Sequence, residues 1–336
     1  MSHKPNRPSS LDVAKLAGVS QAAVSRAFTP HASISDTTKT KVMDAARSLG
    51  YRPNALPRMI ATSRSNLVAL IMGEIANPFY TEVLALLLQE LHPHGLHPLI
   101  FSLKPGQIAD DVISEVFKYR VDGLLITSAT LSAEQARECQ QLDVPVVLFN
   151  RHVDDDATLS ICCDNVAEGR RVADLLLDAG HRHPALMGGN PSDLTDQERE
   201  LGFVGRLRER GIRHVPRHFG PNTYEDGVAG ARAFMQLNPR PDAVFCVSDL
   251  VALGALDEIR HAQGLRVPED VSIIGFDNIP QARWLSYNLT TLSQPIAAMV
   301  RDSVRLLVSR IKGEAGEQYD KLVLSQLIEG GTARLP

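Results

Sequence analysis

The sequence lacks any feature that would take it into or across a membrane. Its first residues, MSHKPNRPSS, contain no apolar core of a signal peptide, and its longest apolar runs, NLVALIM and VLALLL, are much shorter than the roughly 20 residues that span a bilayer. We therefore expect a cytoplasmic protein that does not contact membranes.

Cysteine is scarce, with four residues in 336. They show no paired metal-site spacing, and Cys162 and Cys163 are adjacent in an apolar run, so buried, reduced thiols are expected. No metal site or other cofactor is predicted.

Motifs of catalysis are also missing. We find no Walker A loop, no G-x-G-x-x-G after the first predicted strand and no G-x-S-x-G. The chain is therefore not expected to be an enzyme, although a sugar-metabolising enzyme with an α/β body is the alternative from a different functional class.

Positive charge is concentrated at the start of the chain. The whole chain has a net charge of -4, but residues 1–66 hold ten Lys or Arg against three Asp, a net charge of +7, so the remaining 270 residues carry -11. Contacts with phosphates need local positive charge. Only this basic segment is expected to meet a polyanion, and we call its first part, residues 1–50, the head.

The head begins with the pattern of a short helix. Ser9 and Asp12 form the S-x-x-D signature of a capping box, and Gly18 ends the helix. Its buried side is expected from apolar residues at helical spacing: Leu11, Val13, Ala14, Leu16 and Ala17.

A second helix is predicted over residues 21–28, after the N-cap Ser20. A third starts at the Ser35 cap and runs to Gly50. The first two helices, joined by a tight turn, form a helix-turn-helix. In the second helix Val24, Ala27 and Phe28 face inward, and the outward residues are Gln21, Ala22, Ser25 and Arg26.

The strings LDVAKLAGVSQAAVSRAF and SISDTTKTKVMDAARSLGYRPNAL resemble the DNA-binding head of the LacI/GalR family of bacterial transcription regulators. The resemblance implies that Gln21, Ala22 and Arg26 occupy the base-reading positions of a recognition helix in the major groove. Arg26 can pair bidentately with a guanine, and Ser20 and Ser25 would hold phosphates.

The segment YRPNALPRMIATSRS, residues 51–65, resembles the hinge of the same family, which becomes helical when two subunits meet on operator DNA. The resemblance implies that Ile60 wedges into the minor groove and that Arg58 contacts the groove or a phosphate. Pro57 departs from the family pattern, although proline is tolerated in a first helical turn. A homodimer on double-stranded operator DNA is expected.

From residue 66 onward, apolar runs alternate with amphipathic segments in two series. This alternation predicts an α/β body made of two doubly wound parallel-sheet subdomains, behind the small all-α helix-turn-helix head. The strings NPFY, VDGLLI, PVVLFNR, CVSDLVALGAL, GLRVPEDVSIIGFDN and LTTLSQP resemble the periplasmic-binding-protein-like core of the family. The resemblance implies a head at 1–50, a hinge at 51–65 and an effector-binding and dimerisation body at 66–336. Subdomain one covers about 66–163 and 295–324, and subdomain two about 164–294 and 325–336.

Ligands of such sheets bind at the carboxyl ends of the strands, so the site is expected in the cleft between the subdomains. Carboxylates, amides and an arginine gathered there suit a polyhydroxylated ligand, because a hydroxyl both donates and accepts hydrogen bonds. The resemblance places Asn150, Arg199, Ser248 and Asp277 at ligand-contacting positions. The full set of expected effector residues is Phe79, Asn150, Asp193, Thr195, Arg199, Asn222, Tyr224, Ser248, Asp277 and Trp284.

Together these features predict a sequence-specific DNA-binding transcriptional repressor controlled by a small effector, namely a sugar, sugar alcohol or sugar acid. A purine-responsive regulator of the same fold is the nearest alternative. The purine-binding members have an arginine where this chain has Asp193 and an aromatic residue where it has Asn222, which argues against a flat heterocycle. A transport binding protein would require a secretory signal and no DNA-binding head.

Overall fold

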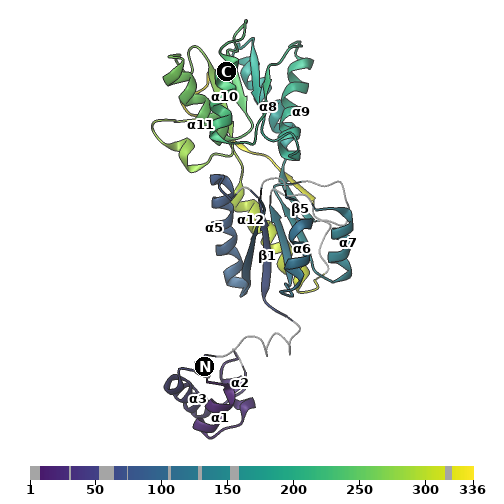
Figure 1. Ribbon diagram of the computed structural model, residues 1–336, viewed down its shortest axis with the longest axis vertical. Coiled ribbons are helices and arrows are strands. Elements are labelled where there is room, and N and C mark those ends of the chain that lie inside the picture. The colour runs from purple at the N-terminus through teal and green to yellow at the C-terminus, as the bar shows by residue number, and fades with distance from the viewer. Residues whose placement is uncertain are drawn as a thin grey trace, which may run out of the picture. The chain divides into compact units, whose positions relative to one another are not determined.

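The computed structural model describes residues 8–29, 32–52, 64–73, 75–104, 107–127, 131–151, 159–314 and 320–336 (Figure 1). Arg58 and Ile60 lie outside the described residues. The chain divides into two units, residues 1–65 and residues 66–336, each of which is described by itself. In the described part, no helix combines the length and apolar character needed to cross a bilayer.

The described residues of the head form three helices: α1 (Ser10–Ala17), α2 (Gln21–Ala27) and α3 (Asp36–Leu49). The predicted capping box of Ser9 and Asp12 is confirmed, as are the left-handed glycines that end α1 and α3. The three helices share a small core made of Val13, Ala14, Val24, Ala27, Val42, Ala45 and Ala46.

Two residues of α1 are not buried as predicted. Leu11 is 50% exposed and Leu16 is 56% exposed. Val13, Ala14 and Ala17 span an arc of about 100° on the helix, from the 3.6-residue repeat, and this arc packs against α2 and α3. Leu11 and Leu16 lie on either side of the arc and remain in contact with solvent.

The body contains two six-stranded sheets, which confirms the predicted fold class. Sheet A is parallel throughout and sheet B has one antiparallel strand, β12. In spatial order, sheet A contains β11 (Asp320–Val323), β5 (Leu159–Cys163), β4 (Val146–Phe149), β3 (Gly123–Thr127), β1 (Leu67–Met72) and β2 (His97–Ser102). Sheet B contains β12 (Gln326–Ile328), β10 (Thr290–Ser293), β9 (Ser272–Phe276), β8 (Ala243–Cys246), β6 (Pro184–Met187) and β7 (Arg217–His218).

Helices cover both faces of each sheet (Figure 1). On sheet A, the two faces hold α5 (Pro78–Leu91) with α12 (Ile296–Ile311), and α6 (Asp110–Phe117) with α7 (Ala133–Gln141). On sheet B, they hold α8 (Asn165–Asp178) with α9 (Leu194–Glu209), and α10 (Tyr224–Phe234) with α11 (Asp249–Asp257). Short turns of helix lie at His92–His94, Glu258–Ala262 and Pro280–Arg283.

The chain passes between the sheets three times, after β5, after β10 and after β11. The strands and helices of residues 66–163, together with α12 and β11, form the sheet A layer, which we call subdomain one. Residues 164–294 and β12 form the sheet B layer, subdomain two. The carboxyl ends of both sets of strands therefore carry the crossing segments.

Helices α8 and α9 approach closely because glycines face each other at their crossing. A Cβ at Gly169 would clash with the carbonyl oxygen of Arg199, and a Cβ at Gly202 would clash with that of Val166. Backbones can come this close only where no side chain stands between them. The crossing thereby fixes the position of α9, and of Arg199 on it.

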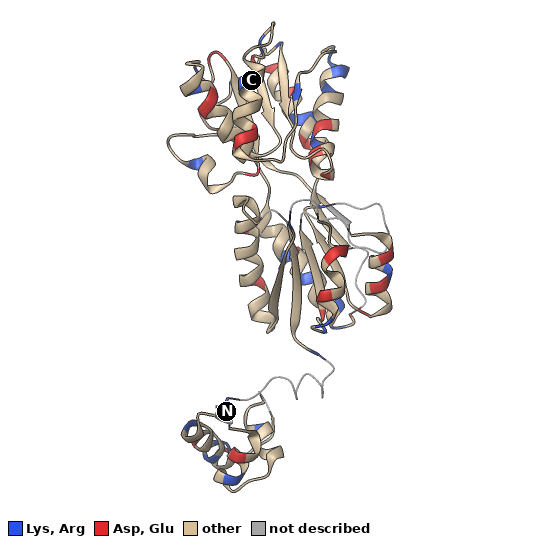
Figure 2. Ribbon diagram, in the orientation of Figure 1, with Lys and Arg blue, Asp and Glu red and all other residues tan. Residues whose placement is uncertain are grey.

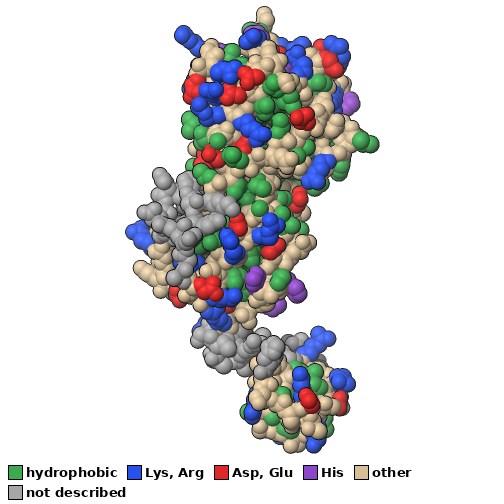
Figure 3. All heavy atoms as spheres, turned by 180° about the vertical axis from the view of Figure 1, so that it is seen from behind, with side chains coloured by type: hydrophobic (Ala, Val, Ile, Leu, Met, Phe, Trp, Pro, Cys, Tyr) green, Lys and Arg blue, Asp and Glu red, His purple; other side chains and the backbone are tan. Residues whose placement is uncertain are grey.

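Ion pairs hold the outer edges of the same two helices together. Arg206 and Arg210 bind Asp174, and Arg170 binds Glu209, with N–O distances of 2.6 to 2.9 Å. Basic and acidic positions are interspersed along the ribbon of these helices (Figure 2), and basic and acidic side chains lie intermixed on the surface of subdomain two (Figure 3). These pairs are partly exposed, so each stabilises the fold only slightly.

Candidate functional site

A polar pocket lies where the carboxyl ends of strands from both sheets meet. Residues from the start of α5 and the end of β4 come from subdomain one, and the others follow β6, β7 and β9 of subdomain two. Its volume is about 20 Å³, which is room for about one water molecule. The pocket is lined by Asn77, Phe79, Tyr80, Asn150, Asp193, Thr195, Asp196, Arg199, Asn222 and Asp277.

Arg199 is the most highly connected side chain of this cleft pocket. It is 4% exposed, and its Nε donates to Oδ1 of Asn165 at 2.9 Å while its Nη1 donates to the carbonyl of Val247 at 2.6 Å. The guanidinium carbon lies 3.7 Å from the centre of the Phe276 ring, a cation–π contact. Its Nη2 is 3.9 Å from Oδ1 of Asp277, which leaves this pair able to share a ligand hydroxyl.

Asp277 follows β9 and is a buried residue of the pocket lining. Its Oδ1 accepts a hydrogen bond of 2.8 Å from Nε2 of Gln294, a residue of the second segment that passes between the sheets. Burial raises the pKa of Asp277 to about 6, although Arg199 and Gln294 both favour the charged form. The neighbouring Asp249 is also buried, and burial raises its pKa.

This burial predicts how stability depends on pH. Between the usual pKa of 3.8 and about 6, folded Asp277 keeps a proton that the unfolded chain has released, so its contribution makes stability fall as pH rises through this window. In Asp277→Asn, we expect a smaller loss of unfolding free energy between pH 4 and pH 6 than in the wild type. Urea unfolding at a series of pH values measures this difference, and an unchanged slope would contradict the assignment.

Three pocket residues have left-handed backbone conformations. Asn150, Asn222 and Asp277 have φ angles of 57°, 66° and 112°. Asn and Asp tolerate this region better than other non-glycine residues. Such conformations concentrate at binding and catalytic sites, where the surrounding structure holds them in place.

An ion pair joins the two subdomains across the pocket. Arg151, the second residue after β4, places its Nη2 3.1 Å from Oδ2 of Asp193, the N-cap residue of α9. The side chains are 4% and 16% exposed. Arg151 is not among the effector residues predicted from the sequence, because its contact depends on a partner in the other subdomain.

Seven of the ten expected effector residues line this pocket: Phe79, Asn150, Asp193, Thr195, Arg199, Asn222 and Asp277. Ser248 lies behind it, where its hydroxyl caps α11 and donates to Oδ1 of Asn222 at 2.6 Å. Asn77 and Tyr80, which belong to the NPFY string noted in the sequence, also line the pocket. The residues that the sequence reasoning missed are Asp196 on the lining, and Asn165 and Gln294 next to it.

The remaining two expected residues do not line the pocket. The hydroxyl of Tyr224 donates to Oδ2 of Asp257 at 2.7 Å, which ties the start of α10 to the end of α11. Trp284 is 56% exposed and stacks on Tyr287. Both side chains find their partners within subdomain two, so neither covers a ligand ring in this pocket.

The outward face of α2 is the one expected from the sequence. The side chains of Gln21, Ala22, Ser25 and Arg26 are exposed. Ser20 is the N-cap, and its hydroxyl accepts from the N–H of Ala23. Nε of Arg26 donates to the carbonyl of Ala22 at 3.4 Å, which is a weak hydrogen bond.

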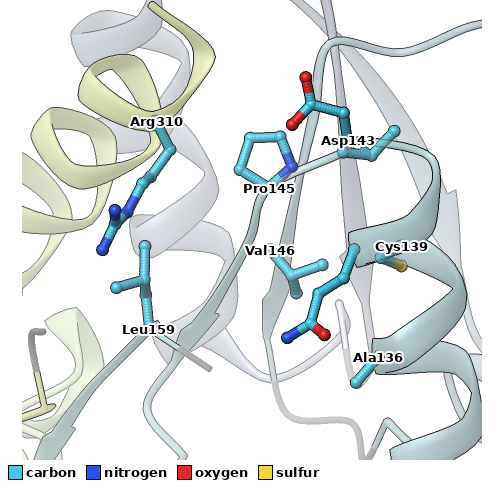
Figure 4. A pocket seen from close by; sticks show the side chains of 9 residues that line it. Ala136, Cys139, Asp143, Pro145, Val146, Leu159 and Arg310 are labelled. Atoms are coloured by element: carbon cyan, nitrogen blue, oxygen red, sulfur yellow. The ribbon is translucent and has the colours of Figure 1, made fainter. Parts of the chain in front are cut away.

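A second hollow, of about 250 Å³, lies at the amino ends of β4 and β5, at the opposite end of sheet A from the cleft pocket (Figure 4). Leu159 and Val146 form part of its wall, and Asp143 and Arg310 approach it from opposite sides (Figure 4). Within the described ranges, no group of three or more His, Cys, Asp or Glu is arranged to hold a metal ion.

Comparisons with known proteins agree with this architecture. The family model of bacterial regulatory proteins, lacI family, matches residues 11–54, and that of the periplasmic binding protein-like domain matches residues 173–333. The HTH-type transcriptional repressor CytR of Escherichia coli (strain K12) is 32% identical over 329 residues, which cover 97% of this chain and 96% of CytR.

Two solved structures share the fold. The complex of the transcriptional regulator CelR with cellobiose has a TM-score of 0.72 at 30% identity, covering 97% of this chain and 100% of CelR. The lac repressor dimer bound to operator and the anti-inducer ONPF has a TM-score of 0.86 at 24% identity, covering 97% and 99% of the two chains. From the length and identity of the match to CytR, together with the match of the head, the chain belongs to the lacI family of bacterial regulatory proteins.

Proposed function

We propose that the protein is a transcriptional repressor whose affinity for operator DNA is set by a small polyhydroxylated ligand bound in the cleft pocket. It acts as a homodimer, because one small head binds DNA weakly and two linked heads reach paired half-sites. Its place of action is the cytoplasm, where operator DNA is found.

The composition of the cleft pocket is the observation that supports a polyhydroxylated ligand. Two Arg–Asp pairs and the amides of Asn150 and Asn222 converge there, and only two of the ten lining residues, Phe79 and Tyr80, are aromatic. Hydroxyls can satisfy both the donors and the acceptors of such a lining. The sugar in the CelR complex supports the same class of ligand.

The lining also indicates how a ligand changes the protein. The pocket draws residues from both subdomains, and in this structure it has room for about one water molecule. A ligand that contacts both subdomains can therefore change their spacing or orientation, which is a hinge-type transition. By linkage, a ligand that changes operator affinity must itself bind differently when DNA is present.

Sequence-specific DNA binding is tested with DNA that the wild-type protein selects from a pool of random sequences. Arg26→Ala is expected to lower affinity for that DNA by roughly 5- to 150-fold, which corresponds to the 1–3 kcal/mol of one bidentate base contact. Arg47→Ala is the matched control, because Arg47 is an exposed arginine of α3 paired with Asp44. Fluorescence anisotropy gives both affinities, and equal losses in the two variants would contradict the role of Arg26.

The ligand side is tested by a thermal-shift screen against sugars, sugar alcohols, sugar acids and purines, since a ligand that binds only the folded state raises its melting temperature. A polyhydroxy hit that also changes affinity for the selected DNA supports the proposal. A hit confined to purines overturns the interpretation of Asp193 and Asn222.

A further inference from the structure

Beside the pocket, three buried polar atoms next to the Arg151–Asp193 ion pair have no hydrogen-bond partner among the described residues. These atoms are Nε and Nη1 of Arg151, and Oδ1 of the adjacent Asn150. Asn150 is 3% exposed and Arg151 is 4% exposed. Buried polar groups are almost always hydrogen-bonded, so these atoms are placed to meet a ligand.

The three atoms require a ligand that both donates and accepts. The two nitrogens of Arg151 are donors only, whereas the amide oxygen of Asn150 is an acceptor only. A hydroxyl group serves both kinds of partner. An ionised carboxylate has no proton to give to Asn150, so it satisfies only the arginine.

The charges around the pocket point to the same kind of ligand. Among the described lining residues, three are carboxylates, Asp193, Asp196 and Asp277, and one is a cation, Arg199. The guanidinium of Arg151 adds a second cation, but Asp193 already pairs with it at 3.1 Å. An anionic ligand would therefore bring a further negative charge into a buried site that holds more carboxylates than guanidiniums.

Asp193 is held firmly in the position that neutralises Arg151. Its Oδ1 accepts from the backbone N–H of Thr195 at 2.9 Å and from the hydroxyl of the same residue, so that it caps α9. Its Oδ2 is left for Arg151. One carboxylate thus starts the helix that carries Arg199 and balances the arginine of the opposite subdomain.

We propose that Asp193 acts as the charge filter of the cleft pocket: by neutralising Arg151 it restricts the site to uncharged polyhydroxy ligands and excludes sugar acids and sugar phosphates. This inference rests on the proposed function, and it narrows the ligand class of the same site. It also assigns Arg151 and Asn150 as a donor and acceptor pair for one ligand hydroxyl.

The test is calorimetry of the full chain with matched neutral and anionic probes: glucose with glucuronate, galactose with galacturonate, ribose with ribose 5-phosphate, and cellobiose with cellobionate. We expect the wild type to bind the neutral member of a pair at least tenfold more tightly than its anion. In Asp193→Asn, which keeps a capping oxygen but loses the charge, we expect this ratio to shift at least tenfold toward the anion.

Asp270→Asn is the matched control, because it removes the carboxylate of another Arg–Asp pair, with Arg266, that lies outside the cleft pocket. Its ratio should equal that of the wild type. If Asp193→Asn does not fold, Asp193→Ser supplies a second capping residue without charge.

The outcomes separate this inference from the proposed function. A wild type that prefers the anion, or a folded Asp193 variant with an unchanged ratio, overturns the charge filter and leaves the proposed function intact. If the wild type binds no member of any pair and the thermal-shift screen also finds no polyhydroxy ligand, the ligand class of the proposed function is wrong, and the charge filter is rejected with it.

Discussion

Replacing Arg199 by alanine is expected to abolish ligand binding and to lower the free energy of unfolding of the body by about 3–5 kcal/mol, the usual cost of removing one partner from a buried charged network. The substitution leaves Asp277 without its cation and removes the donor to the carbonyl of Val247. It also removes the contact with the Phe276 ring. Calorimetry with the ligand found in the screen measures the first effect, and urea unfolding measures the second.

Arg206→Ala is the control for this substitution, because it removes the same side chain from the same helix, two turns further along. Arg206 is 30% exposed and pairs with Asp174 and Glu209 on the surface of α9. Its loss should cost at most about 1 kcal/mol and leave ligand affinity unchanged. If Arg199→Ala bound ligand within twofold of the wild type, the guanidinium would not be a ligand contact.

The second large effect is expected from Gly169→Ala in α8. The added methyl group would meet the carbonyl oxygen of Arg199 and lie 2.8 Å from the backbone nitrogen of Phe203, so α9 must move away. Overpacking of this kind costs about 1–3 kcal/mol and sometimes more. Because the displaced backbone is that of Arg199, ligand affinity should fall at least tenfold together with stability.

Gly205→Ala in α9 provides a matched comparison. A Cβ at Gly205 would meet nothing within 4 Å, so the change should stabilise the helix by up to about 1 kcal/mol through helix propensity alone. Ligand affinity should not change. Melting curves of the two variants should therefore move in opposite directions, and equal melting temperatures would show that the α8–α9 crossing tolerates a side chain.

Local signals in the sequence predicted the head well. The caps of α1, α2 and α3 follow from residue types within three positions of each helix end, and the structure confirms them. The same reasoning was wrong for Leu11 and Leu16. The spacing of apolar residues shows which face of a helix is buried, but it does not show how much of that face the neighbouring helices cover.

The cleft residues that could be predicted from the sequence are those that follow the end of a strand. Asn150, Asn222 and Asp277 are short polar residues directly after strands or before helices, and their positive φ angles explain why Asn and Asp stand there. Tyr224 shares that kind of position but turns to Asp257, and the pairing of Arg151 with Asp193 joins residues 42 positions apart from different sheets. Such contacts depend on how elements far apart in the sequence pack together, and the spacing of residues along the chain does not show this packing.

The three passages between the sheets also set the order in which the chain can fold during synthesis. Sheet A gains its last strand, β11, and the helix α12 only after all but the last strand of sheet B has been made. Until residues 296–311 emerge, the face of sheet A that holds Leu125 and Phe149 lacks one of its two covering helices. Subdomain two is nearly continuous in sequence, so its core can close first. A nascent chain that stalls before α12 would therefore expose apolar surface from subdomain one, the feature that makes partly folded chains prone to aggregation.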